Sequence, residues 1–211
     1  MIERILKYHD MTKYKIDKFL ESNKNNHNDK DRIFFELMFC ISVPQTKAPA
    51  TRMAVKRMFE NGIIYTGNEK QICESLSCVR FNDAKSKRIV EARQNFETVY
   101  AKINELKTRP LELREWVVEN VKGIGWKESS HFLRNIGLGE DLAIFDVHIL
   151  RTMQTMQLIK SNNGEPITSA TGKRYLEYEK IFQDLSKKYN LNPAHMDIAI
   201  WLMCSGNSEI M

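Results

Sequence analysis

Apolar residues in this sequence recur mostly at intervals of three and four, and this spacing constrains the fold more than any other feature. It places side chains along one face of an α-helix, whereas a half-buried strand requires strict alternation, of which we find no convincing set. Prolines and glycines fall mostly between the periodic segments. We therefore predict an all-α protein, with helices over residues 1–21, 31–42, 47–60, 69–77, 83–99, 111–121, 126–135, 174–189 and 193–204.

Two polar segments interrupt this pattern. The stretch SNKNNHNDKD (22–31) is predicted to be a mobile loop, and a second loop is expected over residues 161–173. The helix over 31–42 should stop near Pro44, and Asn61-Gly62 is a good signal for the end of the next helix.

The composition is that of a soluble globular protein, with 42% hydrophobic and 28% charged residues. The excess of 32 basic over 27 acidic residues, a net charge of +5, permits a phosphate-binding face without establishing one. The four cysteines form no C-x-x-C pair, zinc-like spacing or Fe–S pattern, as expected in a reducing compartment. The charged start MIERILKYHD resembles neither a signal peptide nor a membrane span. We expect an intracellular, cytoplasmic monomer that requires no metal or cofactor and does not bind a membrane.

Gly123, Ile124 and Gly125 form a short connection between two predicted helices. The glycines permit positive φ and the close approach of another backbone, while Ile124 can fill the gap between the helices. The backbone N–H groups that begin the second helix would then be available to an anion such as a DNA phosphate. The alternative is an ordinary helix turn, since G-x-G is a common pattern.

Lys127 lies on the first turn of the helix that follows this hairpin. The positive end of the helix dipole disfavours an ammonium there, and desolvation by Trp126 acts in the same direction. Both effects favour the neutral amine that nucleophilic attack requires. The alternative is an ordinary solvated lysine.

Asp146 stands within an apolar run, where an isolated carboxylate is costly unless it has a structural or chemical task. It can cap the helix that begins near Val147, and it can also stabilise a cationic sugar as a base departs. His148 and Arg151 follow at a spacing of one turn and could reach phosphates. Alternatively, His148 could be a core residue and Arg151 a solvated surface residue.

The segment VKGIGWKESSHFLRNIGLGEDLAIFDVHILR (121–151) resembles the signature of the helix-hairpin-helix DNA glycosylases. The K-E-x-S-H-F-L-R-N run, and the separation of 19 residues between Lys127 and Asp146, resemble the short microbial 8-oxoguanine DNA glycosylase/AP lyases. The resemblance implies one catalytic unit of two helical lobes with the active site in the cleft between them. Residues 33–128 would form the central lobe ending in the hairpin, and residues 1–32 plus 138–211 the second lobe.

The same resemblance implies further site residues. Gln45, in the loop SVPQTKA, matches a position whose side chain fills the space left by an extruded nucleotide; it could equally be a helix-start residue. Arg80 and Lys85 match a helix start close to DNA, although Lys85 could equally belong to a solvated face. The base pocket would include Trp201, His131 and the terminal carboxylate of Met211. Alternatively, Trp201 could be a core aromatic residue, and the tail that ends at Met211 could be disordered.

The implied partner is double-stranded DNA that contains a damaged base. The target nucleotide would be flipped out, Lys127 would attack C1′, and the Schiff base formed would cleave the strand by β-elimination. This chemistry needs no metal, although the family makes a monovalent ion on the hairpin carbonyls plausible. The alternatives are an oxidised-pyrimidine glycosylase/lyase on the same scaffold and a non-catalytic helix-hairpin-helix DNA-binding module.

Two positions depart from the family pattern. The proline often found before the aspartate is absent, since Ala143-Ile144-Phe145 precedes Asp146, so the loop geometry there is in doubt. His131 stands where the eukaryotic-type enzymes carry a cysteine, so their mode of recognising the damaged base is not carried over.

Overall fold

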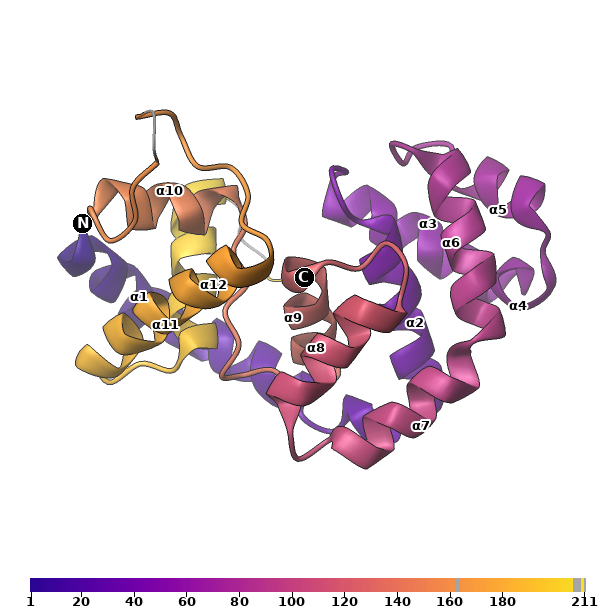
Figure 1. Ribbon diagram of the computed structural model, residues 1–211, viewed down its shortest axis with the longest axis horizontal. Helices are drawn as coiled ribbons and strands as arrows, with labels where there is room; N and C mark the ends of the chain where they lie inside the picture. Colours follow the sequence, from indigo (N-terminus) through magenta and orange to yellow (C-terminus); the bar gives the residue numbers. More distant parts are fainter. Residues whose placement is uncertain (162–163, 207–209, 211) are drawn as a thin grey trace. The chain divides into compact units, whose positions relative to one another are not determined.

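The structure of the chain, a computed structural model, describes residues 1–161, 164–206 and 210. Every regular element in these ranges is a helix, which confirms the all-α prediction (Figure 1). No helix in the described part of the chain combines the length and apolar character needed to cross a membrane. The elements are α1 (Ile2–Asn23), the 3-10 helix η1 (Asn26–Asn28), α2 (Lys30–Ser42), α3 (Ala48–Glu60), α4 (Ile63–Thr66), α5 (Glu69–Ser75), α6 (Asn82–Gln94), α7 (Phe96–Leu106), α8 (Pro110–Asn120), α9 (Trp126–Asn135), α10 (Val147–Thr155), α11 (Gly172–Lys188) and α12 (Pro193–Ser205).

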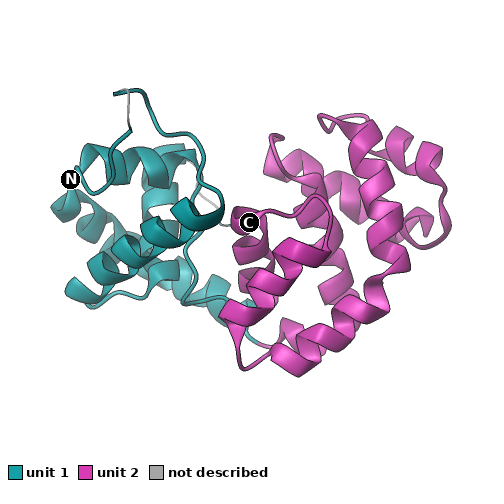
Figure 2. Cartoon of the chain, in the orientation of Figure 1, with its two compact units in different colours: residues 1–24, 139–210 teal, residues 25–138, 211 magenta. Residues whose placement is uncertain are grey.

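The chain divides into two compact units (Figure 2). Unit 1 combines residues 1–24 with the described residues of 139–210, so it joins α1 to the three last helices. Unit 2 is continuous over residues 25–138 and contains η1 and the helices from α2 to α9.

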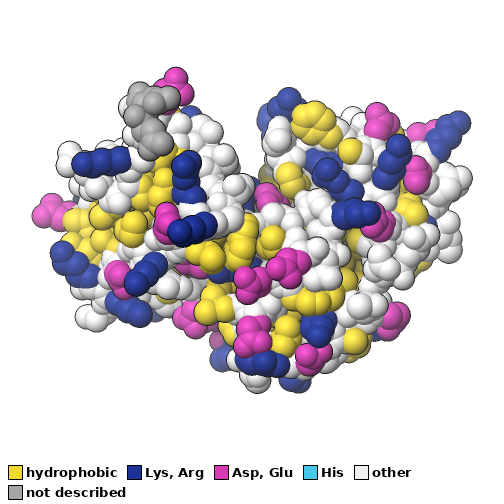
Figure 3. Space-filling view, viewed as in Figure 1, with side chains coloured by type: hydrophobic (Ala, Val, Ile, Leu, Met, Phe, Trp, Pro, Cys, Tyr) yellow, Lys and Arg dark blue, Asp and Glu magenta, His cyan; other side chains and the backbone are white. Residues whose placement is uncertain are grey.

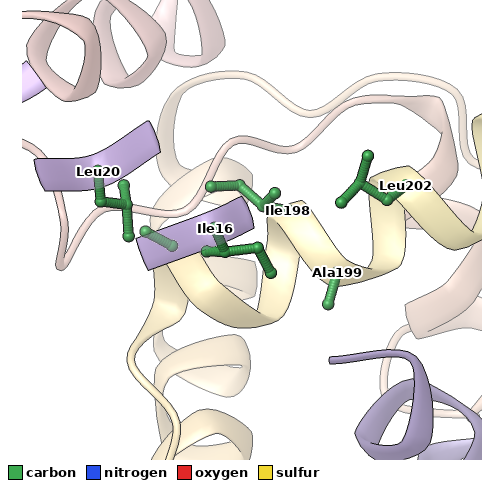
Figure 4. Packing of buried hydrophobic residues seen from close by; sticks show 6 residues of the cluster. Ile16, Leu20, Ile198, Ala199 and Leu202 are labelled. Carbon is green, nitrogen blue, oxygen red and sulfur yellow. The ribbon is translucent and has the colours of Figure 1, made fainter. Parts of the chain in front are cut away.

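The core of unit 1 forms where α1 packs along α12 (Figure 4). Because α12 is apolar on most of its circumference, it can be buried by several neighbours at once. His9 of α1 also contacts α12, with its Nε2 atom 3.1 Å from Nδ1 of His195. The buried residues of this cluster are Ile16, Leu20, Ala194, Ile198, Ala199 and Leu202, and the side chains of Tyr8, Phe19, Trp201 and Ile210 pack against them.

The core of unit 2 is organised around α2, whose residues from Leu37 to Ser42 are all buried. This run is apolar on every side of the helix, as expected of a helix surrounded by others. It packs against α3, α6, α7 and α9. Unit 2 is therefore built around one largely apolar helix.

The predicted loop over 22–31 is wrong in large part. Helix α1 extends to Asn23, η1 occupies 26–28, and α2 already begins at Lys30. The carboxylate of Asp29 accepts a hydrogen bond from Arg32 N at 3.0 Å and so caps α2. The side chain of Asn26 donates to the Asn135 carbonyl at 2.8 Å. Polar residues here cap a helix and make a hydrogen bond to a residue distant in the sequence, and composition alone does not reveal either contact.

The single helix predicted over 83–99 is also wrong, because the chain divides at Asn95 into α6 and α7. The bend lets Phe96 pack on Phe34, with ring centroids 4.6 Å apart. Helix α7 then continues to Leu106, beyond the predicted end, and the one-turn helix α4 was not predicted. The predicted stop at Asn61-Gly62 is confirmed, since Asn61 ends α3 and Gly62 has a φ of 75°.

Candidate functional site

The hairpin between α8 and α9 has the predicted tight geometry. Gly123 has a φ of 90°, and a Cβ atom there would lie 2.6 Å from Arg88 Cδ on α6. Gly125 instead adopts an extended conformation with a φ of −98°, so the expectation of positive φ holds for Gly123 alone. Ile124 is buried and fills the gap between the two helices. Glycine is therefore favoured at position 123 for two reasons. Its φ is positive, and the Arg88 side chain lies where a Cβ atom would be.

Arg114 holds the two helices of the hairpin, α8 and α9, together. It was not identified from the sequence. It is 1% exposed and donates from Nη1 to Ser130 Oγ at 3.2 Å, while its guanidinium lies 5.1 Å from the centroid of the Trp126 ring. Ser129 Oγ returns a hydrogen bond to the Arg114 carbonyl at 3.2 Å. These bonds join α8 to the first turns of α9. The available signal was an arginine with apolar residues one helical turn away on both sides, Leu111 and Val117.

The first turn of α9 is suited to an anion. Within the ranges that the structure describes, no side chain caps this helix at Gly125. Its first N–H groups and the positive end of its dipole therefore lie beside the hairpin. Lys122, also in the hairpin, lies with Nζ 2.7 Å from Glu91 Oε1 on α6.

Lys127 lies on this first turn and is neither buried nor fully solvated. Its side chain is 35% exposed, and Nζ lies 3.5 Å from Oε1 of Glu128, which is 15% exposed. The neighbouring carboxylate is placed to hold the ammonium and to receive a proton from it. What sets Lys127 apart is its place on the first turn of α9, directly after the hairpin.

Asp146, in unit 1, is the N-cap of α10, which confirms the capping role. Its Oδ1 atom accepts hydrogen bonds from the backbone N–H of His148 at 2.8 Å and of Ile149 at 3.0 Å. Among the described residues no donor pairs with Oδ2. One carboxylate oxygen is thus fixed by the helix, and the other remains available to a positive charge.

The loop before Asp146 is held by residues that sequence reasoning missed. Glu179 Oε1 accepts from Ala143 N at 3.1 Å, and Asp197 Oδ2 accepts from Ile144 N at 2.9 Å. The Tyr175 hydroxyl donates to the Ala143 carbonyl at 2.6 Å. Glu179 and Asp197 are almost completely buried, and an acid within the apolar run of α12 was the signal that could have identified Asp197.

These bonds bear on the proline that is absent before Asp146. A proline would restrict the backbone by its ring, whereas here α11 and α12 hold the loop through hydrogen bonds to Ala143 and Ile144. Phe145 adds a buried anchor, with its ring centroid 4.9 Å from that of Tyr175 and 5.7 Å from that of Phe182. The loop is therefore constrained without proline.

In unit 2, Gln45 and Phe81 occupy two exposed turns with unusual backbone conformations. Their φ angles are 58° and 59°, in the left-handed region that residues other than glycine seldom adopt. Phe81 is 56% exposed, which is high for a large aromatic side chain, and Arg80 lies over its ring at 5.3 Å. Phe81 was not singled out from the sequence, although the neighbouring Arg80 was.

Lys85 is only 2% exposed, so the alternative of a solvated face is wrong for this residue. Its Nζ donates to the Pro44 carbonyl at 2.7 Å and to Thr46 Oγ1 at 3.2 Å. Burial, followed by the nearby charges of Arg88 and Arg80, lowers the pKa of Lys85 to about 8. Its ammonium therefore faces the loop that carries Gln45.

The remaining predicted residues lie as follows. In unit 1, His148 is half-buried, Arg151 is exposed, and Trp201 is half-buried against the core cluster. In unit 2, His131 is half-buried and meets the Phe39 ring edge-on, with centroids 5.8 Å apart. Met211, proposed for the base pocket, lies outside the described residues.

The predicted residues thus divide between the units. Unit 2 carries the hairpin, Lys127, Gln45, Arg80, Lys85 and His131, and unit 1 carries Asp146, His148, Arg151 and Trp201. In the described ranges, no group of three or more His, Cys, Asp or Glu side chains has the placement to hold a metal ion. On the face drawn in Figure 3, Lys and Arg side chains gather over α3 and α6, with Asp and Glu side chains among them.

Comparison with protein families supports one family across most of the chain. Residues 12–191 match the family model described as 8-oxoguanine DNA glycosylase. A protein of Fusobacterium nucleatum named 8-oxoguanine DNA glycosylase/AP lyase is 37% identical over 189 residues, which cover 86% of this chain and 83% of that protein.

Two solved structures are similar over nearly the whole chain. The 8-oxoguanine DNA glycosylase of Thermotoga maritima has a TM-score of 0.85 at 29% identity and covers 99% of this chain and 97% of its own. The Methanocaldococcus jannaschii 8-oxoguanine glycosylase/lyase, solved in complex with a 15mer DNA containing 8-oxoguanine, also has a TM-score of 0.85. Its identity is 30%, with 98% of this chain and 99% of its own covered.

Proposed function

Because the chain belongs to the 8-oxoguanine DNA glycosylase family, we propose that it excises 8-oxoguanine from double-stranded DNA and then cleaves the strand as an AP lyase. It does so as an intracellular monomer. The observation that carries the proposal is the partly buried Lys127 on the uncapped first turn that follows the hairpin. An amine placed there can attack a sugar whose phosphates are held by the same helix end.

The hairpin holds the DNA backbone without selecting a sequence. Gly123 and Gly125 carry no side chain that would obstruct a phosphate, and the first N–H groups of α9 can donate to its oxygens. His148 and Arg151, one turn apart on α10, and Arg80, beside Phe81, add side chains that can contact phosphates. Backbone contacts of this kind fix the position of the enzyme, and the damaged base is selected at a later step.

The target nucleotide must leave the helix before reaction, because C1′ is unreachable within the base stack. Gln45 and Phe81 supply one polar and one aromatic exposed side chain on protruding turns of unit 2. Such side chains can occupy the space of the extruded nucleotide and stack on neighbouring bases. His131 of unit 2 and Trp201 of unit 1 are assigned to recognition of the extruded base.

Lys127 performs the covalent chemistry. Its neutral Nζ attacks C1′, the bond from C1′ to the base breaks, and the base leaves with the bonding electrons and is then protonated. Opening of the sugar ring converts the adduct to a Schiff base. Loss of a C2′ proton then breaks the bond from C3′ to its phosphate oxygen, which cleaves the strand. Glu128, at 3.5 Å, is placed to accept the proton that Lys127 must lose.

Asp146 stabilises the positive charge that develops on the sugar as the base departs. Its Oδ1 atom is occupied by two backbone N–H groups, which leaves Oδ2 to interact with this charge. The same principle applies in glycoside hydrolysis, where carboxylates stabilise an oxocarbenium-like transition state.

A panel of duplexes tests the substrate. Each carries one lesion, 8-oxoguanine, thymine glycol or an abasic site, and strand cleavage is measured under single-turnover conditions. We expect rapid cleavage at 8-oxoguanine and at the abasic site. Preferential cleavage at thymine glycol would instead identify an oxidised-pyrimidine enzyme.

Borohydride trapping tests the mechanism. The wild-type chain should form a covalent adduct with 8-oxoguanine DNA, and Lys127→Gln should form none. Absence of a wild-type adduct and of cleavage, with DNA binding retained, would indicate a non-catalytic binding module. An adduct formed equally well by Lys127→Gln would contradict the role of this lysine.

A further inference from the structure

We propose that Lys85 is a positioning residue that holds the Gln45 turn to the Phe81 turn, so that the two exposed side chains enter DNA as one unit. This inference rests on the proposed function, because it concerns how the target nucleotide is extruded. It assigns Lys85 no contact with DNA or with the reacting atoms.

Lys85 makes hydrogen bonds to the residues on both sides of Gln45 in the sequence. The Nζ atom donates to the carbonyl of Pro44 at 2.7 Å and to Oγ1 of Thr46 at 3.2 Å, one residue before and one residue after Gln45. The turn itself closes with a hydrogen bond from Thr46 N to the Val43 carbonyl at 3.1 Å. The backbone on both sides of Gln45 is therefore held in place, while the Gln45 side chain remains exposed.

The second turn is attached to Lys85 through the backbone. Lys85 N donates to the carbonyl of Phe81 at 3.0 Å, in the first hydrogen bond of α6. One residue thus bonds the Phe81 turn through its main chain and the Gln45 turn through its side chain. Both turns have φ near +58°, and strained conformations persist where surrounding contacts enforce them. The bonds of Lys85 supply this enforcement for Gln45.

The charges around Lys85 do not favour a buried ammonium at this position. The two acceptors are uncharged, and the charged groups that act on Lys85 are Arg80 and Arg88 from its own segment and Glu128 from α9. Desolvation is the largest effect, and with the two arginines it lowers the pKa of Lys85 to about 8. Burial and the two arginines therefore disfavour the charged form, and the two hydrogen bonds are the contacts that hold the ammonium in place.

The test compares Lys85→Met with Lys107→Met. Methionine retains most of the side-chain length and removes the donor, and Lys107 is an exposed lysine at the end of α7 in the same unit. Thermal unfolding, single-turnover cleavage of 8-oxoguanine duplex and cleavage of an abasic-site duplex are measured for both. An abasic site has no base to extrude, so it separates the chemistry of Lys127 from strand opening.

For Lys85→Met we expect near wild-type cleavage of the abasic site, and thermal unfolding shows whether the variant is folded. Cleavage at 8-oxoguanine should fall by about tenfold or more, because misplacement of a group by 1 Å commonly costs this much. Lys107→Met should match the wild type in all three. Wild-type cleavage at 8-oxoguanine by Lys85→Met, or an equal loss on both duplexes, would overturn the proposal.

A double-mutant cycle separates positioning from a general structural effect. If Lys85 acts through Gln45, then adding Lys85→Met to Gln45→Ala should change the 8-oxoguanine rate by less than about twofold. Additive losses would overturn the proposal. Failure of the wild-type chain to process 8-oxoguanine would instead refute the proposed function, so the two failures are distinguishable.

If Lys85→Met does not fold, the proposal can still be tested by a pH titration of a protein that retains Lys85. In the Lys127→Gln background, strand opening is followed by the fluorescence of 2-aminopurine beside 8-oxoguanine from pH 7 to 9. Opening should weaken around pH 8, because a neutral amine donates weaker hydrogen bonds than an ammonium. The decline should disappear when Gln45→Ala is added. An opening signal that does not change with pH would overturn the proposal.

Discussion

The Lys127 amine, in unit 2, lies 3.5 Å from the Glu128 carboxylate, and its side chain is 35% exposed. The Asp146 carboxylate, in unit 1, accepts two backbone N–H bonds, and the loop before it is bonded to the buried carboxylates of Glu179 and Asp197. The amine is held by one charged neighbour on its own helix turn, whereas the carboxylate is part of a connected set of bonds from three helices.

This difference matches what each group is proposed to do. A nucleophile must lose a proton, approach C1′ and carry the sugar as a covalent adduct, so it requires freedom to move. A carboxylate that stabilises a developing charge is most effective when it is already fixed in place. Substitution of Lys127 should therefore change activity without stability, whereas removal of the helix cap at Asp146 should change both.

The largest effect is expected for Lys127→Gln. Strand cleavage and borohydride trapping should fall to the detection limit, while the free energy of unfolding changes by no more than about 0.5 kcal/mol, as for a surface substitution. Thermal unfolding and gel-based trapping measure the two quantities on the same preparation. A large loss of stability would show that the fold depends on this amine, which would break the contrast with Asp146.

Asp146→Asn should follow, with base release slower by about 10²–10³-fold through loss of the charge. Its stability should remain near that of the wild type, because Asn caps a helix about as well as Asp. Asp146→Ala removes the cap as well and should cost about 1 kcal/mol in stability. Base release is measured by alkaline cleavage after single-turnover reaction. Equal activity of Asp146→Asn and wild type would refute the electrostatic role.

Asp197→Ala tests the support beneath Asp146. It leaves the Ile144 N–H without its acceptor, which should cost about 1–3 kcal/mol in unfolding free energy. Base release should also slow, because the loop before Asp146 loses one of its two carboxylate bonds. Asp184→Ala, an exposed position on α11, is the matched control. Normal base release by a destabilised Asp197→Ala would show that the loop keeps its position without this bond.

Gly123→Ala should cost about 1–2 kcal/mol in stability, because its φ of 90° disfavours a Cβ atom. Affinity for undamaged duplex should also fall, since the added methyl group would displace Arg88. Gly62→Ala is the control for strain alone, because its φ is 75° and a Cβ there meets nothing within 4 Å. Equal DNA affinity of Gly123→Ala and Gly62→Ala would argue against a role for the close contact at the hairpin.

Several site features could be predicted from the sequence because they depend on residues a few positions apart. The positive φ of Gly123 and the capping of α10 by Asp146 are confirmed, and both follow from local steric and hydrogen-bonding rules. The same rules misjudged residues 22–31, where the partner of Asn26 is Asn135. The chemical roles of Lys127 and Asp146 remain predictions.

The contacts that were missed act over long separations. Glu179 bonds a residue 36 positions away and Asp197 one 53 positions away, and Lys85 reaches Pro44 across 41 positions. In the sequence each is an ordinary charged residue on a helix. Only its burial turns it into a support for a loop.

The sequence by itself determined the all-α class, the hairpin with its left-handed glycine and the helix that Asp146 caps. Each of these depends on backbone sterics and hydrogen bonds within about one helical turn. Tertiary structure alone decided which charges are buried and what they hold: Arg114 within the hairpin, Lys85 beneath the Gln45 turn, and two carboxylates beneath the Asp146 loop. The physical reason is that the cost of burying a charge, and the partner that compensates for it, are set by segments distant in the chain.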